Sequence, residues 1–405
     1  MLANSLEFRP EHDAAIFASV PAAPAIFSLQ GDAGTEPYVS KTANLRRRLL
    51  RQLSPPSQSS RRLNLRDRVR TIQYAATGSD FESGLLLYRM LRQLFPSTYV
   101  KRLRLRPAAL VRLIRENEFP RASVTTRIAT LRGQSLYYGP FPSRAAAEKF
   151  ASDSLDFFKM RRCTDDLHPD PAFPGCIYSE MKMCLAPCFL GCTDADYREE
   201  VGRVQEFLDT RGYSLVRHIT SLREQASAAL EFEKAAATHL RLEKLAAVLA
   251  QLPEIVRRID QLSGLIIQPS AVPDSVALFR IEQGRLNGPV AFDLQHQTPG
   301  QSGKLQSMES RLTSALATLP ALASCTAQET MEQLAYLKRW YYRTSRVGEV
   351  FFTDEEGDLP LRRIVRGISR VFKGERAGPE LRDVAHDYWI NRGKAAELNP
   401  DDYNV

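Results

Sequence analysis

The chain has 405 residues, a net charge of +8 and a hydrophobic content of 43%. These values are typical of a protein with two to four domains and ordinary apolar cores. The apolar stretch 14–27 is too short to span a bilayer and contains Pro21 and Pro24, and the first residues lack the basic-then-apolar order of a signal peptide. We therefore expect a cytoplasmic protein with no membrane partner, which excludes the membrane-spanning and secreted classes.

Positive charge is concentrated in one part of the sequence. Between Lys41 and Arg106 there are sixteen Lys or Arg residues and only three acidic residues. Such an excess, mostly of arginine, is typical of surfaces that neutralise nucleic-acid phosphates, although a solvated helix face is the alternative. We predict nucleic-acid contact through Lys41, Arg46, Arg47, Arg48, Arg51, Arg61, Arg62 and Arg102.

The first part of the chain predicts a small α/β domain. After an N-terminal tail (1–20), a strand over 25–29 leads through a Gly/Asp turn to a second strand and a helix over 44–53. A second helix is predicted over 82–95, where apolar residues recur at helical spacing until Pro96. We assign residues 21–106 to this domain and 107–160 to an α/β connecting region, in which 137–143 is a turn before a helix over 144–158.

The rest of the chain predicts a cysteine-rich segment (161–193), a helical region (194–252) and a mixed α/β C-terminal region (253–405). Within the helical region, two amphipathic helices with a short break predict an antiparallel hairpin over about 216–251. The C-terminal region shows two strand-like runs around a turn at Gln283 and Gly284, and then helices. The fold class is therefore a multidomain α/β (α+β) protein.

The cysteines indicate a metal site. Five of the six lie between Cys163 and Cys192, and two of them frame the sequence Cys-Leu-Ala-Pro-Cys at 184–188. In a reducing compartment, closely spaced thiols are more often ligands than disulfides. Four thiolates suit either zinc or an iron–sulfur cluster.

Taken in order, four segments of the sequence resemble the UvrC family of excinucleases, which make incisions in bacterial nucleotide excision repair. The first resembles the family's GIY-YIG nuclease, and the last resembles the UVR motif that pairs with the helicase-like protein UvrB. These segments are 25–27 with 38–49, then 138–143, then the cysteine segment, and finally 228–236.

The resemblance implies a metal-dependent nuclease site, but several of its residues are replaced. Tyr38, Lys41 and Arg48 match the family's catalytic positions. Phe27 stands in place of a tyrosine, Tyr88 in place of the metal-binding glutamate, and Val100 in place of an asparagine. A neutral phenol is a poor ligand for a hard cation, so we expect the usual cleavage to be lost and Mg²⁺ to bind only if activity is retained.

The resemblance also implies a cofactor and a partner. The family carries a [4Fe–4S] cluster, and its ligand positions match Cys163, Cys176, Cys184 and Cys188, with zinc as the alternative and Cys192 as a spare ligand. The UVR-like hairpin implies docking on a UvrB-type subunit through Leu230, Phe232 and Ala236, whereas an ordinary core helix pair is the alternative. The segment after the hairpin shows no spaced aspartates typical of the family's RNase H-like nuclease.

Three functions remain open from the sequence. The first is a DNA-binding repair protein that docks on a UvrB-type subunit without cutting. The second is an active endonuclease with a rearranged metal site that uses Glu36 or Glu82. The third is a nucleic-acid-binding regulator that competes with a full-length UvrC.

Overall fold

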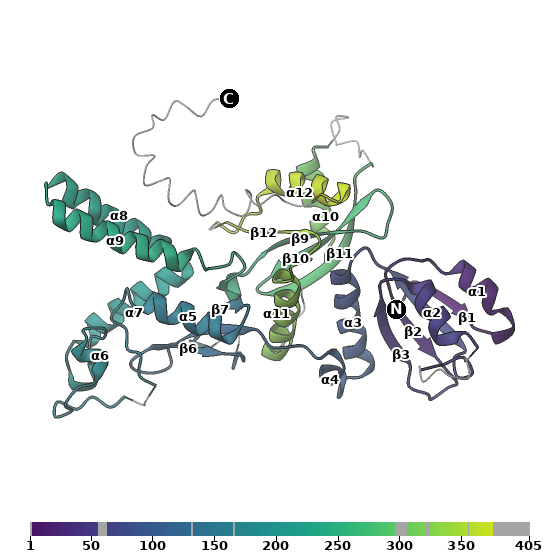
Figure 1. The fold of residues 1–405 in the computed structure, drawn as a ribbon, viewed down its shortest axis with the longest axis horizontal. Helices are drawn as coiled ribbons and strands as arrows, with labels where there is room; N and C mark the ends of the chain where they lie inside the picture. The colour runs from purple at the N-terminus through teal and green to yellow at the C-terminus, as the bar shows by residue number, and fades with distance from the viewer. Residues whose placement is uncertain are drawn as a thin grey trace.

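The part of the chain that the structure describes is elongated and is built around three antiparallel four-stranded sheets with helices packed on them (Figure 1). The computed structural model describes residues 2–55, 63–130, 133–164, 167–295, 306–320, 322, 325–354 and 356–375. This architecture confirms the prediction of a multidomain α+β protein. In this part of the chain, no helix is long and apolar enough to cross a membrane.

The N-terminal sheet has the strand order β1-β4-β2-β3. Its elements are β1 (Asn4–Glu7), a 3-10 turn (Pro10–His12), α1 (Asp13–Ser19), β2 (Ala25–Gln30), β3 (Tyr38–Thr42), α2 (Leu45–Leu53) and β4 (Thr71–Ala76). Because β2 is central and pairs on both sides, nearly all of its side chains are buried. The predicted strands and the first helix are confirmed, and the Asn44 side chain caps α2 by accepting a hydrogen bond from the Arg47 amide.

The prediction of an N-terminal tail over 1–20 is wrong. Strand β1 pairs with β4, and Phe8, Phe17 and Val20 are at most 6% exposed in the core of this sheet. These side chains remove more apolar area from water than an unpaired tail does, which is why the segment folds back onto the sheet.

Helices α3 (Asp80–Leu94) and α4 (Tyr99–Leu103) connect the N-terminal sheet to the rest of the molecule. The Ser79 side chain caps α3 by accepting a hydrogen bond from the Glu82 amide. The buried side chains of α3, among them Phe81, Leu85 and Tyr88, belong to the large central core rather than to the core of the first sheet. The helix predicted over 82–95 is therefore confirmed, and it faces the C-terminal region.

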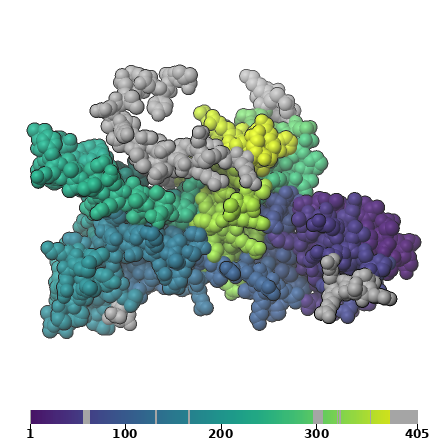
Figure 2. All heavy atoms as spheres, in the orientation of Figure 1, coloured from purple at the N-terminus to yellow at the C-terminus, as the bar shows by residue number. Residues whose placement is uncertain are grey.

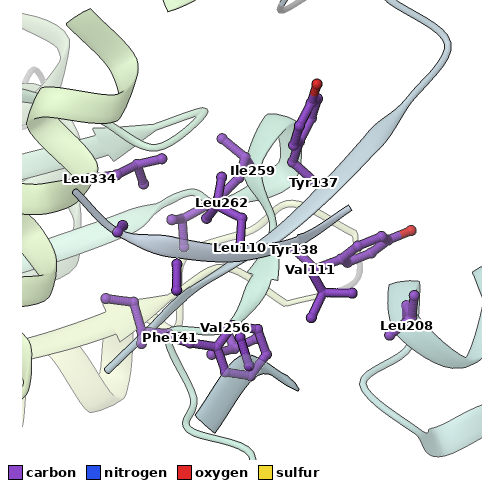
Figure 3. Close-up of a cluster of buried hydrophobic side chains, with 14 of the residues drawn as sticks. Leu110, Val111, Tyr137, Tyr138, Phe141, Leu208, Val256, Ile259, Leu262 and Leu334 are labelled. Carbon is purple, nitrogen blue, oxygen red and sulfur yellow. The ribbon is translucent and has the colours of Figure 1, made fainter. Parts of the chain in front are cut away.

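The middle sheet has the order β6-β5-β7-β8. It comprises β5 (Ala109–Ile114), β6 (Arg121–Thr125), β7 (Leu136–Phe141) and β8 (Arg257–Arg258), with α5 (Arg144–Leu155) packed on it. The predicted turn over 137–143 is wrong for residues 137–141, because Tyr138 and Phe141 are buried and strand β7 pairs with β5. Figure 3 shows these side chains in one cluster with Leu208, Val256 and Leu334, which come from distant parts of the chain.

The cysteine segment and the helical region follow. The segment contains two short helical turns, α6 (Ile177–Glu180) and a 3-10 turn (Pro187–Phe189), and α7 (Asp194–Asp209) leads out of it. Helices α8 (Tyr213–Ala228) and α9 (Phe232–Leu249) pack antiparallel on each other, as predicted. The hairpin extends away from the sheets in Figure 1, so its tip is remote from the core.

The C-terminal sheet has the order β11-β10-β9-β12. After a 3-10 turn (Ile259–Gln261), its elements are β9 (Gly264–Pro269), β10 (Ser275–Glu282), β11 (Arg285–Asp293), α10 (Met308–Ala317), α11 (Ala327–Tyr341), β12 (Glu349–Phe352) and α12 (Leu361–Lys373). The turn at Gln283–Gly284 is confirmed between β10 and β11. Successive side chains of β9 point into two different cores on opposite faces of the sheet. Helix α11 covers one face, and α10 and α12 cover the other.

Candidate functional site

Tyr38 and Arg48 form the part of the predicted nuclease site that the structure brings together. Arg48 Nη2 donates a hydrogen bond to Tyr38 Oη over 3.2 Å. Burial on its own raises the pKa of Tyr38, but hydrogen bonds involving Gln52, Arg48 and Ser40 outweigh it and lower the pKa. Phe27, which the sequence predicts to replace the first family tyrosine, is fully buried with its ring 6.1 Å from that of Tyr38.

Lys41, the third predicted catalytic residue, does not contact the Tyr38–Arg48 pair. Successive side chains of a strand point to opposite faces, so Tyr38 and Lys41, three residues apart on β3, point away from each other. Lys41 Nζ instead contacts Asp80 Oδ1 at 2.5 Å, and Arg343 from the end of α11 contacts the other oxygen of the same carboxylate at 3.0 Å. Burial opposes the shift, but the two cations lower the pKa of Asp80. This triad therefore joins the first sheet, α3 and the C-terminal region.

Tyr88, which the sequence predicts to occupy the family's metal-ligand position, lies in the interior of the protein. Its side chain is 3% exposed, and its hydroxyl donates a hydrogen bond of 3.0 Å to Glu332 Oε2 on α11. Tyr99 donates to the same carboxylate over 2.9 Å. Burial, followed by the negative charge of Glu332, raises the pKa of Tyr88 well above the ordinary value for a phenol. Val100, which the sequence predicts to replace a family asparagine, is exposed.

The alternative metal ligands considered from sequence are also engaged. Glu36 forms an ion pair with Arg102 at 2.6 Å. Glu82 is buried at the start of α3 and accepts a hydrogen bond of 2.8 Å from the Gly78 amide. Burial is the larger influence on this carboxyl and raises the pKa of Glu82. Both carboxylates therefore already have a partner within the protein, Arg102 for Glu36 and the Gly78 amide for Glu82.

Some residues of the predicted basic surface contact other parts of the protein, and others point to solvent. Arg46 donates to the carbonyls of Val20 and Ala18, so it holds α2 against the segment before β2. Arg102 lies over the Phe95 ring, with the guanidinium carbon 4.0 Å from its centroid. Arg47 and Arg51 point to solvent on α2. Arg61 and Arg62 lie outside the described residues.

The four predicted cysteine ligands lie in one region. Burial, together with the charges of the neighbouring Cys163, Cys188 and Cys176, raises the pKa of the Cys184 thiol to about 11. The Ala186 amide donates to Cys184 Sγ over 3.3 Å. Among the described residues, no three His, Cys, Asp or Glu side chains form a set arranged to hold a metal ion. Four neighbouring thiols still suit a positively charged metal group, because such a group stabilises their thiolates.

Arg161 is a neighbour of this region that the sequence did not reveal. It is 1% exposed, its Nε donates to the Phe119 carbonyl over 2.9 Å, and its Nη1 lies 3.5 Å from Cys163 Sγ. Tyr197 Oη accepts a hydrogen bond from the Arg161 amide and donates one to the Pro120 carbonyl. Arginines are frequent in this chain, so composition gave no signal that this one is buried beside a thiol.

The predicted partner-binding residues lie at the tip of the α8–α9 hairpin. Leu230 is 70% exposed in the left-handed conformation of the turn, and Phe232 is 68% exposed at the start of α9. Ala236 is exposed one turn further along. At the other end of α9, Leu245 is fully buried in the central core. The hairpin is therefore anchored at its base and presents apolar side chains at its tip.

The fold and these groups define a multidomain α+β protein with a clustered set of thiols and a projecting helical hairpin. Residues 110–207 match the family described as "UvrC/Cho excinuclease, middle domain". This match covers β5 to α7 and includes all four predicted cysteine ligands. Residues 110–207 are therefore a middle domain of the UvrC/Cho excinuclease type.

Relatives support this assignment over a longer stretch. The UvrABC system protein C of Alcanivorax borkumensis is 32% identical over 227 residues, which cover 56% of this chain and 36% of the relative. Those of Alkalilimnicola ehrlichii and Carboxydothermus hydrogenoformans are 27% and 26% identical, over 66% and 67% of this chain and 43% and 44% of the relatives. The chain thus spans less than half the length of the relatives it matches. No solved structure gives a significant match.

Proposed function

We propose that this protein acts in nucleotide excision repair by binding DNA and a UvrB-type helicase subunit, without the incision chemistry of a GIY-YIG nuclease. The observation that carries the proposal is the position of Tyr88. A residue that would hold the catalytic metal ion must present an oxygen ligand, preferably a carboxylate, to that cation. The Tyr88 hydroxyl instead donates a hydrogen bond to Glu332 inside the core, and the pKa of this tyrosine is raised. This side chain supports the packing of α11 on α3.

A nicking assay tests the loss of incision. Purified protein is incubated with damaged duplex DNA and Mg²⁺ or Mn²⁺, beside the Arg48→Ala variant. We expect no strand breaks above background with either protein. Robust nicking that disappears in Arg48→Ala would overturn the proposal, because it would show that the Tyr38–Arg48 pair still supports cleavage.

One observation favours a second function, that of an endonuclease with a rearranged site. Arg48 still contacts Tyr38, the pKa of this tyrosine is lowered, and Arg48 Nε is buried with no hydrogen-bond partner among the described residues. Such a pair suits a phosphate oxygen and a proton relay. The recruited carboxylates that this function needs, Glu36 and Glu82, are held by Arg102 and by the Gly78 amide. We therefore favour the first function.

For the cysteine segment, we propose that Cys163, Cys176, Cys184 and Cys188 hold a [4Fe–4S] cluster, which would cross-link the loop and has a structural role. The support is the shared location of these thiols within the family-matched middle region. Zinc is the alternative, since four thiolates accept both. Iron and acid-labile sulfide in stoichiometric amounts support the cluster, whereas zinc alone in metal analysis contradicts it.

For the hairpin, we propose that the apolar tip docks on a helical segment of the UvrB-type subunit. Two exposed large apolar side chains close together at the end of a hairpin leave apolar area in water that a partner helix pair would bury. Capture of a UvrB C-terminal segment by the immobilised protein tests this. We expect the Phe232→Ala variant to capture less, with an unchanged circular dichroism spectrum. Equal capture contradicts the docking role.

A further inference from the structure

Helix α12 has a fixed inner face that packs on the C-terminal sheet. Ile364, Ile368 and Val371 are at most 6% exposed in the core between this helix and the sheet. A Cβ atom at Gly367 would lie 2.5 Å from the Phe351 ring, so the helix lies close against β12. Its rotation is therefore set by the packing.

An ion pair also joins α12 to β12. Arg370 donates from Nε and Nη2 to the two oxygens of Glu349 over 2.8 and 2.7 Å, and both side chains are largely buried. Such a bidentate pair has a fixed geometry, so Arg370 is structural and is not available to a ligand. The other basic residues of α12 are exposed to solvent.

The outer face of α12 is a basic stripe, defined by Arg362, Arg366 and Lys373, with Arg363 beside it. All four are exposed, and the helix contains no acidic residue. At about 100° per residue, the three residues of the stripe lie within about 40° of one another, and at about 1.5 Å per residue they span about 16 Å. In Figure 2 this helix lies at the surface, in yellow at the top of the view.

The stripe is not explained by helix stability. Arg362 and Arg363 stand in the first turn, where the helix dipole favours acidic residues, and Arg362 and Arg366 are like charges four residues apart. The described residues form no ion pair with Arg362, Arg363 or Arg366. The acidic turn just before the helix closes on itself, because the Asp354 carboxylate accepts the amides of Glu356 and Asp358. An anionic partner bound along this face would relieve the repulsion.

We propose that the basic stripe of α12 binds the phosphate backbone of DNA, as a contact surface separate from the N-terminal arginines. The inference rests on the DNA-binding part of the proposed function. A span of about 16 Å matches four to five phosphates of one strand at about 3.4 Å of axial rise each. An anionic membrane fits less well, because the apolar face that would enter lipid is already buried against the sheet.

Exposed cations spread along one helix face suit phosphate oxygens, which are the same for every base sequence. We therefore expect the affinity of this contact to depend little on base sequence. The stripe lies on the face of the C-terminal sheet opposite α11, and therefore away from the α3–α11 contact. DNA held there would pass over the outer side of the C-terminal region.

The test compares the full chain with the triple variant Arg362→Gln, Arg366→Gln and Lys373→Gln. Fluorescence anisotropy with a labelled duplex gives affinity as a function of salt concentration. The matched control removes three exposed helical cations elsewhere, by Arg198→Gln, Lys234→Gln and Lys244→Gln. Glutamine preserves helix propensity, and circular dichroism of both variants checks the fold.

We expect the stripe variant to bind DNA at least about tenfold more weakly near 0.1 M salt. The slope of log K against the logarithm of the salt concentration should be less negative by about 2.7, because each of the three lost phosphate contacts removes about 0.9 from that slope. The control variant should match the wild type. If the wild type binds DNA and the stripe variant keeps its affinity and slope, the inference fails while the proposed function stands. If the wild type binds no DNA, the proposed function itself fails. Binding to anionic vesicles that depends on the stripe, without an effect on DNA, also overturns the inference.

Discussion

Restoring the family's glutamate at position 88 should destabilise this protein rather than repair a nuclease site. The Tyr88 ring is 3% exposed, and its hydroxyl is 3.0 Å from Glu332 Oε2. The substitution Tyr88→Glu removes most of the ring from the core, which costs about 2 to 3 kcal/mol. It also places a second carboxylate beside Glu332. At about 4 Å and an effective dielectric constant of about 20, their repulsion is about 4 kcal/mol.

Protonation limits this electrostatic cost. A glutamate with an ordinary pKa near 4.3 is kept neutral at pH 7 at a cost of about 3.7 kcal/mol, and at pH 5 at a cost of about 1 kcal/mol. The folded state raises the pKa of the introduced carboxyl, so the electrostatic destabilisation is absent below the unfolded pKa and grows as the pH rises. We therefore expect Tyr88→Glu to cost about 6 kcal/mol at pH 7 and about 3 to 4 kcal/mol at pH 5. This is comparable to the net stability of a typical domain.

Trp340 on α11 reports on this interface, because its ring lies 5.0 Å from that of Phe81 on α3. We would follow its fluorescence during guanidinium unfolding, in a Trp389→Phe background, at both pH values. The control is Tyr88→Phe, which loses one hydrogen bond and should cost about 1 kcal/mol with little dependence on pH. Adding Glu332→Gln to Tyr88→Glu should recover part of the loss. Equal midpoints for Tyr88→Glu and Tyr88→Phe at pH 7 would refute the reasoning.

Three further predictions concern the rest of the molecule. In the hairpin, Leu245→Ala should cost about 2 to 5 kcal/mol because this side chain is fully buried, whereas Phe232→Ala should leave the unfolding midpoint unchanged and reduce only partner capture. In the cysteine segment, Cys184→Ser should lose bound iron and sulfide in metal analysis, and Cys325→Ser should retain them, since that thiol bonds Thr330 far from the segment. In α12, Gly367→Ala should lower the unfolding midpoint, because the new Cβ would clash with the Phe351 ring and cost about 1 to 3 kcal/mol of stability. An unchanged midpoint would mean that the helix moves freely on its sheet.

Features that depend on neighbouring residues were predictable from the sequence. The start of α2 follows from Asn44, whose side chain caps the helix by accepting the amide of Arg47 three residues later. The hairpin break and the turn at Gln283–Gly284 follow from local apolar spacing and a glycine at positive φ. The candidate ligands Cys163 to Cys188 were identified from spacing and from the family resemblance, and the structure places them in one region.

Features that depend on distant segments were decided only by the tertiary structure. Local pattern did not show that 137–141 forms a strand, because its partner strands β5 and β8 lie up to 120 residues away in the chain. Nor did local pattern show that Lys41 and Arg343 both pair with Asp80, or that Tyr38 is hydrogen-bonded to Arg48. These contacts depend on which helix covers each face of the sheet.

Position 88 shows the division most clearly. The sequence by itself determined that residue 88 is a tyrosine, at a position where the family resemblance predicts a carboxylate. Only the fold decided what the tyrosine does, because its partner Glu332 is 244 residues later in the chain. A hydrogen bond between such distant residues depends on which surfaces pack together, and that packing is a property of the whole chain rather than of any local segment.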